Sequence, residues 1–211
     1  MNENKSVAEL LIKSGCYVNS KKSGQSEIVT PNGDSVSAYL SCRLAISQVE
    51  VREKIEVLMA QKIKEKFKEY DKLTIIGMAT AGITWAHSIA QRLKLPLLYI
   101  RSNEKNYGLK GLIEGGIKNS TEKAIIVDDV LYTGNTIEKA KNILKDSGIK
   151  IEGVVCIANL RDKVVSKLEY ENINVISLTN YKEIIQSALK NNVLDENEYE
   201  VMKAIYEERN I

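Results

Sequence analysis

The fold of this chain is decided by residues 125–136, which read Ile125-Ile126-Val127-Asp128-Asp129-Val130-Leu131-Tyr132-Thr133-Gly134-Asn135-Thr136. Aliphatic residues run without interruption up to Val127, which predicts a strand buried on both faces and therefore a parallel sheet. Two acids and a Thr-Gly turn then lead into a helix predicted over residues 136–146. Ligands bind at the carboxyl ends of strands in open parallel sheets, so this junction is the first candidate for a site.

Strands and helices alternate on both sides of this stretch. Strands are predicted at 73–77, 97–100, 151–158 and 174–178, and helices at 49–70, 82–93, 181–190 and about 197–209. This order predicts the α/β class, with a central parallel sheet flanked by helices. Before residue 49, a short helix at 7–12 and two short strands around the turn Asn32-Gly33-Asp34 predict a small N-terminal hood. We therefore expect a hood (1–48), an α/β core (49–180) and C-terminal helices (181–211) packed on the core or the hood.

Composition excludes several classes of protein. The 211 residues, 44% of them hydrophobic, suffice for one full domain and rule out a wholly disordered chain. No apolar run approaches the ~18 residues of a membrane span, and the first ten residues do not form a secretory signal. A net charge of +2 gives no support for nucleic-acid binding. Cys16, Cys42 and Cys156 lack metal-ligand spacing and are interpreted as packing residues of a protein in the reducing cytoplasm, and His87 as a structural helix residue.

The residues after Val127 have the composition of a site for a phosphorylated sugar. Two adjacent acids at a strand end need a cation or sugar hydroxyls, because a buried unpaired carboxylate is costly. The turn that follows offers backbone N–H groups, hydroxyls and a helix N-terminus, which together suit a phosphate dianion. An Asx-type cap followed by an ordinary helix entry would use the same residues, so both interpretations stay open on this pattern alone.

As a whole, residues 125–136 resemble the phosphoribosyl pyrophosphate signature of the type I phosphoribosyltransferases. The resemblance implies that Asp128 and Asp129 hold the ribose hydroxyls and that the turn binds the 5′-phosphate. The segment 77–83 is similar to the pyrophosphate loop of the same family, where small residues let the backbone approach a diphosphate. The implied donor-binding residues of the two segments are Ala79, Thr80, Ala81, Gly82, Asp128, Asp129, Val130, Leu131, Tyr132, Thr133, Gly134, Asn135 and Thr136.

The segment 99–115 is similar to the catalytic loop of the orotate phosphoribosyltransferases within this family. Arg101 and Lys105 match basic positions of that loop and suit a departing pyrophosphate, since both can neutralise developing negative charge. Tyr107 stands where the family has histidine, and its phenol carries no positive charge. The resemblance implies that Arg101, Lys105 and Tyr107 bind the donor, and that Arg101, Lys105, Asp128 and Asp129 are catalytic. A solvated basic loop is the plain alternative for Arg101 and Lys105.

Recognition of the base is implied for Arg161 and Tyr132. Arg161 follows the strand predicted at 151–158 and matches the arginine that contacts orotate in the family. A guanidinium can meet a carboxylate and a ring carbonyl in one plane, although a plain surface arginine would look the same in sequence. The hood fits the family pattern less well, because the segment 30–43 lacks the expected lysines.

The resemblance implies a pentosyltransferase of pyrimidine biosynthesis. Its reaction would transfer phosphoribosyl from 5-phosphoribosyl 1-pyrophosphate to orotate, giving orotidine 5′-phosphate and pyrophosphate. Mg²⁺ would be carried mainly by the diphosphate, with Asp128 or Asp129 reaching it through water. A cytoplasmic homodimer is implied, whose catalytic loop is shared across subunits, with no nucleic acid or membrane as partner.

Two alternatives to this function stay open. The first is a phosphoribosyltransferase for a different nucleobase, which Tyr107 and the altered hood favour. The second is a non-catalytic regulator that binds phosphoribosyl pyrophosphate or a nucleotide. Retention of Arg101 and Lys105 argues against such a regulator, and the missing histidine argues for it. A nucleic-acid-binding regulator is disfavoured by the balanced charge.

Overall fold

The computed structural model describes residues 6–20, 24, 28–29, 35–36, 38–103, 111–117 and 121–210. The chain divides into two compact units, one formed by Met1–Glu53 with Thr179–Ile211 and the other by Lys54–Leu178. All candidate site residues with a described position belong to the second unit. In the part of the chain that the structure describes, no helix is long and apolar enough to cross a membrane.

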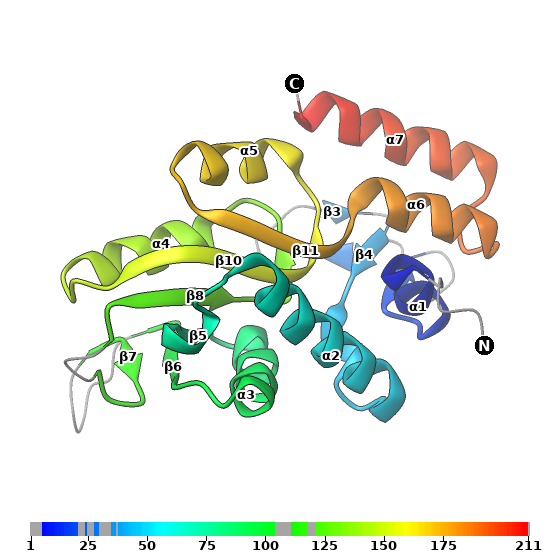
Figure 1. The fold of residues 1–211 in the computed structure, drawn as a ribbon. Helices are drawn as coiled ribbons and strands as arrows, with labels where there is room; N and C mark the ends of the chain where they lie inside the picture. The colour runs from blue at the N-terminus through cyan, green and yellow to red at the C-terminus, as the bar shows by residue number, and fades with distance from the viewer. Residues whose placement is uncertain are drawn as a thin grey trace. The chain divides into compact units, whose positions relative to one another are not determined.

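A mostly parallel sheet forms the centre of the unit 54–178 (Figure 1). Its strands are β5 (Thr74–Met78), β6 (Leu97–Ile100), β7 (Ile113–Glu114), β8 (Lys123–Val127), β9 (Val130–Leu131), β10 (Lys150–Asn159) and β11 (Asn174–Asn180). The order is β11-β10-β8-β5-β6-β7, and β9 pairs with β10. The β10–β8, β8–β5 and β5–β6 pairs are parallel, whereas β7 is antiparallel to β6. The predicted parallel sheet is therefore confirmed, with an antiparallel edge strand that the sequence did not indicate.

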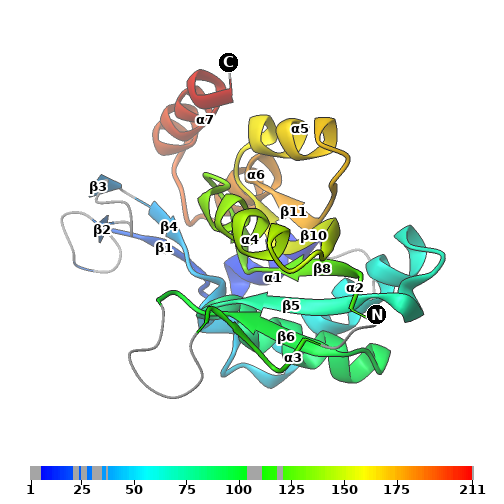
Figure 2. The same cartoon turned by 90° about the vertical axis from the view of Figure 1, so that its left-hand side faces the viewer.

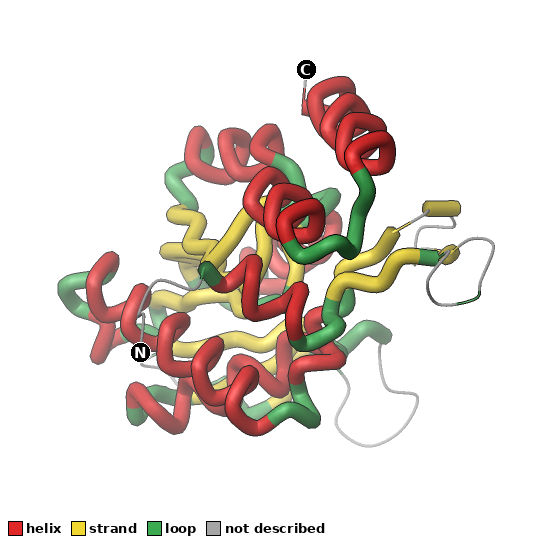
Figure 3. Tube along the Cα trace, turned by 90° about the vertical axis from the view of Figure 1, so that its right-hand side faces the viewer, coloured by secondary structure: helices red, strands yellow, loops and turns green. Residues whose placement is uncertain are grey.

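Helices cover both faces of this sheet (Figure 2). They are α2 (Val49–Lys66), α3 (Ala81–Leu93), α4 (Asn135–Lys145) and α5 (Asp162–Tyr170). Ile76 of β5 shares a buried cluster with Ile137 of α4 and Leu168 of α5, so these two helices lie on one face. Gly77 points to the other face, where an added Cβ would stand 2.9 Å from the Cβ atom of Ala86 on α3. Figure 3 shows red helices on both sides of the yellow strands.

Burial on both faces explains the aliphatic runs. Every residue of β5 is buried, and Ile125, Ile126 and Val127 are fully buried. A strand that packs against helices on both sides has no polar face, so its residues need not alternate. The three cysteines are buried and form no disulfide, which agrees with their interpretation as packing residues.

The unit formed by the two ends of the chain contains short elements. They are α1 (Val7–Lys13), β1 (Tyr17–Asn19), β2 (Ile28–Val29), β3 (Ser35–Val36), β4 (Ala38–Leu40), the 3₁₀ helix Cys42–Ala45, α6 (Tyr181–Lys190) and α7 (Glu196–Asn210). The predicted hairpin is present as the antiparallel β2–β3 pair, although its turn lies outside the described residues. An antiparallel β1–β4 pair was not predicted. Helix α6 packs against α1 and α7, and the rings of Tyr181 and Tyr206 stack with centroids 5.1 Å apart.

One predicted helix was too long, and one helix was not predicted. The helix expected over 49–70 ends at Lys66, because the chain forms a 3₁₀ turn over Tyr70–Lys72 before Leu73 leads into the sheet. Helix α5 was not predicted, although Val164, Val165 and Leu168 have helical spacing and all three contribute to the core. Its short length, nine residues, gave the periodic pattern little room to show.

Candidate functional site

The carboxyl ends of the parallel strands bring the predicted loops together. The N–H group of Ala79, just after β5, donates to the carbonyl of Ile100 in β6 at 2.9 Å. On the other side of β5, the first turn of α3 lies against the end of β8: a Cβ on Gly82 would stand 2.3 Å from the carbonyl oxygen of Val127. The segments 79–82 and 128–129 therefore lie next to each other. The peptide bond between Ala79 and Thr80 is cis.

Asp128 and Asp129 follow β8 as half-buried side chains. The Oδ1 atom of Asp128 accepts a hydrogen bond from the N–H group of Asp129 at 2.9 Å, and Oδ1 of Asp129 accepts from Val130 at 3.0 Å. The carbonyl of Asp129 also accepts from the N–H group of Ile157 in β10 at 3.0 Å. Both carboxylates are thus anchored to the backbone, which keeps two negative charges at the end of the strand.

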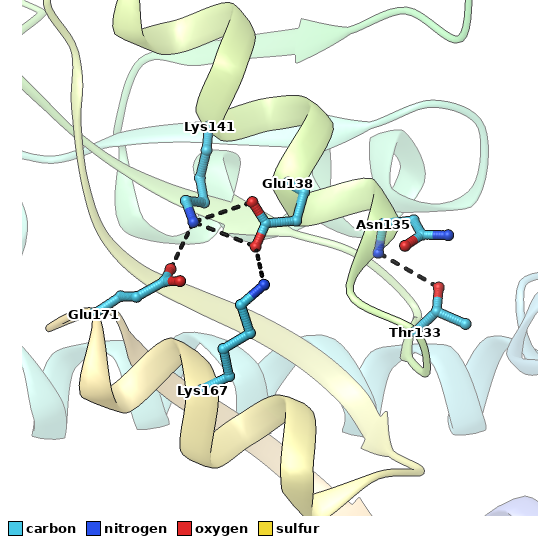
Figure 4. A network of polar contacts seen from close by, with 6 residues as sticks. All are labelled: Thr133, Asn135, Glu138, Lys141, Lys167 and Glu171. Atoms are coloured by element: carbon cyan, nitrogen blue, oxygen red, sulfur yellow. Dashed lines mark hydrogen bonds and ion pairs between the residues drawn. The ribbon is translucent and has the colours of Figure 1, made fainter.

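The turn after β9 leads into α4 through a left-handed glycine. Gly134 caps the helix with φ of 79°, a conformation that costs other residues more than glycine. The hydroxyl oxygen of Thr133 accepts a hydrogen bond from the N–H group of Asn135 at 3.4 Å (Figure 4). Asn135 and Thr136 are exposed in the first turn of the helix. Hydroxyls, exposed first-turn residues and a helix N-terminus suit a phosphate group.

Arg101 leaves the end of β6 and pairs with Glu114 of β7. Its Nη1 atom lies 3.2 Å from Oε1 of Glu114, and its Nε donates to the carbonyl of Asn103 at 3.1 Å. These contacts hold a half-buried guanidinium at the strand edge. Lys105 and Tyr107 lie outside the described residues.

Arg161 and Tyr132, predicted to contact the base, are in direct contact with each other. Nη2 of Arg161 donates to the hydroxyl of Tyr132 at 3.0 Å, and Cζ of Arg161 lies 4.3 Å from the centroid of the tyrosine ring. Arg161 caps the N-terminus of α5 with extended backbone.

Two residues near the site were missed by the sequence analysis. Lys139 on α4 donates through Nζ to the carbonyl of Ser102, and the hydroxyl of Ser102 lies 3.5 Å from the carbonyl oxygen of Ala79. Asn159 is buried at the end of β10, where Oδ1 accepts from the N–H group of Arg161 at 2.9 Å and Nδ2 donates to Asp162 at 3.0 Å. Asn159 could have been found as a polar residue at the end of an aliphatic strand. Lys139 could have been found because it lies about one helical turn after Thr136, on the same face of the helix.

A charged network links α4 to α5 beside the phosphate-type turn (Figure 4). Glu138 accepts from Lys167 at 2.8 Å and from Lys141 at 3.1 Å, and Lys141 also donates to Glu171 at 2.6 Å. The hydrogen bond from Lys167, followed by that from Lys141, lowers the pKa of Glu138 below its ordinary value. The network therefore ties the helix after Tyr132 to the helix after Arg161.

The acidic pair after β8 has the chemistry that could take part in holding Mg²⁺ together with substrate phosphates. Among the described residues, no group of three or more His, Cys, Asp and Glu side chains could hold a metal ion. Mg²⁺ keeps several waters and is usually bound through one or two carboxylates together with substrate phosphates. Asp128 and Asp129, adjacent at the end of β8, are two carboxylates that could take this role.

Comparisons with known proteins agree with one another. Residues 36–191 match the family model described as a phosphoribosyl transferase domain. The orotate phosphoribosyltransferase of Listeria innocua is 34% identical over 166 residues, which are 78% of either protein. The solved orotate phosphoribosyltransferase of Aeropyrum pernix superposes with a TM-score of 0.69 at 23% identity, covering 85% of this chain and 96% of that one. The UMP synthase of Leishmania donovani gives a TM-score of 0.77 at 18% identity, covering 96% of this chain, which spans only 42% of that synthase.

Proposed function

Since the chain belongs to the phosphoribosyl transferase family of pentosyltransferases, we propose that it is an orotate phosphoribosyltransferase of pyrimidine biosynthesis. It would convert 5-phosphoribosyl 1-pyrophosphate and orotate into orotidine 5′-phosphate and pyrophosphate. One observation carries the proposal: three kinds of group lie together at the carboxyl ends of the strands. They are the acidic pair Asp128 and Asp129, the phosphate-type turn 132–136 and Arg161. The names of the relatives at 34% identity support orotate as the base.

The donor would be held by two loops that the sheet brings together. The turn 132–136 would receive the 5′-phosphate, while Asp128 and Asp129 would accept hydrogen bonds from the ribose hydroxyls. Residues 79–82 would receive the diphosphate, where Gly82 lets helix and strand approach closely. Carboxylates suit hydroxyl groups because an ionised carboxylate only accepts hydrogen bonds. Backbone N–H groups suit phosphate because they only donate them.

The transfer replaces one bond at C1 of the ribose by another. The bond from C1 to the pyrophosphate oxygen breaks and its electron pair leaves with the pyrophosphate, while a ring nitrogen of the base forms the new bond to C1 and gives up its proton to the pyrophosphate or to water. Positive charge that develops on the ribose is stabilised by the carboxylates of Asp128 and Asp129. Negative charge on the leaving pyrophosphate is met by Arg101, held at the strand edge by Glu114, and by Lys105. Mg²⁺ bound with the diphosphate would supply further charge neutralisation.

The base would be recognised by Arg161. Its guanidinium can donate two parallel hydrogen bonds to a carboxylate, and orotate is a pyrimidine that carries one. Because Tyr107 replaces a histidine of the family and the segment 30–43 lacks the expected lysines, a different nucleobase is the second candidate.

The deciding experiment is a spectrophotometric assay of the purified protein. It would contain Mg²⁺, 5-phosphoribosyl 1-pyrophosphate and, in parallel, orotate, uracil or a purine base, with pyrophosphate release measured separately. Orotate loss matched by pyrophosphate release supports the proposal, and removal of Mg²⁺ with a chelator should abolish both. Release of pyrophosphate only with another base would identify that base as the substrate in place of orotate. Donor binding without release would identify a non-catalytic regulator.

We also propose a cytoplasmic homodimer that shares its catalytic loop between subunits. Mixing subunits that carry Lys105→Ala with subunits that carry Arg161→Ala tests the sharing. If each active site combines residues of both subunits, the mixture recovers part of the activity that both variants lack. Absence of recovery in a protein shown to exchange subunits would contradict the proposal.

A further inference from the structure

The contact between Tyr132 and Arg161 follows from the register of two strands. β9 and β10 run parallel, with Val130 opposite Ala158 and Leu131 opposite Asn159. The N–H group of Leu160 still donates to the carbonyl of Leu131 at 2.9 Å. The two side chains therefore emerge from neighbouring chain ends immediately beyond the paired residues, so the sheet itself places them side by side.

Arg161 is held at both ends. Its backbone N–H group donates to Oδ1 of Asn159 at 2.9 Å, and Asn159 is only 4% exposed. At the other end, the Tyr132 ring lies 4.3 Å from Cζ and the Tyr132 hydroxyl accepts from Nη2 at 3.0 Å. One face and one nitrogen of a planar group are thus both restrained, which fixes the plane of the guanidinium.

Among the described residues, the Arg161 guanidinium contacts neutral groups, the ring and the hydroxyl of Tyr132. Its nitrogen Nε is enclosed with no hydrogen-bond acceptor. The neighbouring acid, Asp162, accepts a hydrogen bond from Asn159. A half-buried guanidinium whose contacts are the ring and hydroxyl of a tyrosine is best satisfied by an anion.

We propose that Tyr132 is a positioning residue, which orients the guanidinium of Arg161 toward the carboxylate of the base. The inference rests on the proposed function and adds to it how the arginine is aimed. Tyr132 is the first residue of the turn 132–136 that would bind the 5′-phosphate, so one segment serves both the phosphate and the base. Holding the guanidinium in place lowers the conformational entropy lost when the carboxylate binds.

Two variants separate the parts of the contact. Tyr132→Phe keeps the ring and removes the hydroxyl, whereas Tyr132→Leu removes both. Tyr170→Leu is the matched control, because Tyr170 on α5 is 90% exposed. Calorimetric titration with orotidine 5′-phosphate measures phosphate and base binding together, and titration with ribose 5-phosphate measures binding at the phosphate turn alone.

We expect Tyr132→Leu to weaken orotidine 5′-phosphate binding about tenfold and Tyr132→Phe less, by about threefold. Ribose 5-phosphate binding should change less than about twofold in both variants. The KM for orotate should rise in parallel while the KM for the donor stays near its original value. In an Arg161→Ala background, Tyr132→Leu should add nothing, because the residue acts through the arginine.

Several results would overturn the inference. If Tyr132→Leu weakened orotidine 5′-phosphate binding further in the Arg161→Ala background, Tyr132 would contact the base by itself. Tighter binding by Tyr132→Leu would mean that the tyrosine screens Arg161 from the ligand. An equal loss for ribose 5-phosphate would show a distorted turn. Unaltered protein that neither binds nor converts orotate would refute the proposed function and this inference together, whereas orotate conversion with additive losses would refute this inference alone.

Discussion

Gly82 of α3 lies so close to Val127 of β8 that a Cβ atom on Gly82 would stand 2.3 Å from the carbonyl oxygen of Val127. Such a distance is far inside van der Waals contact, and the clash would be with backbone. The absence of a side chain at Gly82 is therefore what lets the loop 79–82 reach the acids that follow β8.

Gly82→Ala should separate the two loops. We expect a loss of about 2–3 kcal/mol in the free energy of unfolding, because helix or strand must move to admit the methyl group. Urea unfolding measures the loss, and Gln91→Ala, at an exposed position of the same helix, should change stability by less than about 0.5 kcal/mol. A Gly82→Ala protein with unaltered stability and donor binding would show that the close approach is not needed.

Arg101→Ala should lower turnover about 100-fold, since one charge-assisted donor to the leaving group is lost. Glu114→Gln should lower it by a smaller factor, because Arg101 then keeps its charge and loses its ion pair. Steady-state kinetics measures both. Arg92→Ala is the control: Arg92 pairs with buried Glu56 at 3.2 Å, so this change should cost about 1.5–3 kcal/mol of stability without lowering turnover of the folded fraction. Full activity of Arg101→Ala would exclude it from catalysis.

Lys105→Ala should lower turnover far more than it lowers donor affinity. The expectation rests on the sequence, in which Lys105 matches a basic position of the family's catalytic loop. An ammonium that meets charge developing in the transition state contributes little to ground-state binding. Single-turnover rates and donor titration separate the two effects, with the exposed Lys190→Ala as control. Unchanged turnover would remove Lys105 from the mechanism.

Glu138 should make stability depend on pH in the acid range. Hydrogen bonds from Lys167 and Lys141 lower its pKa in the folded state, so its contribution is present above the unfolded pKa of about 4.3 and is lost as pH falls through the folded pKa. Glu138→Gln should therefore cost less than about 1 kcal/mol at pH 7, and the cost should shrink as the pH is lowered through the acid range. Urea unfolding at both pH values tests this against Glu169→Gln on α5. If the stability difference between the unaltered protein and Glu138→Gln grew toward low pH, the pKa of Glu138 would be raised and not lowered, which would contradict the argument.

The three thiols should react with a thiol reagent only after unfolding. Cys16, Cys42 and Cys156 are all buried. Burial raises the pKa of Cys156, and the nearby carboxylate of Asp128 raises it further, while burial also raises the pKa of Cys16. A raised pKa leaves little of the reactive thiolate at pH 8. Colorimetric thiol titration should find three reactive groups in denaturant and almost none in the native protein; rapid native reaction would show that these side chains are accessible.

Local features of the sequence were sufficient for the long parallel strands of the sheet and for the acidic and phosphate-type segments. An aliphatic run such as Ile125–Val127 reports its own burial, because only a strand covered on both faces avoids polar residues. The Gly-containing turn before α4 was predictable for the same reason, since Gly134 satisfies a local backbone requirement. Helix α5 and the 3₁₀ turn at Tyr70–Lys72 escaped because both are short.

What the sequence by itself determined was therefore the long strands of the central sheet, most of the helices and the chemistry at the ends of those strands. The tertiary structure alone decided which of those ends meet: Tyr132 with Arg161, 29 positions apart, and Lys139 with Ser102, 37 apart. Such contacts depend on strand order and register, which arise from packing across the whole sheet. No local pattern of residues records them, because each partner's own neighbours in the sequence would be the same without the contact.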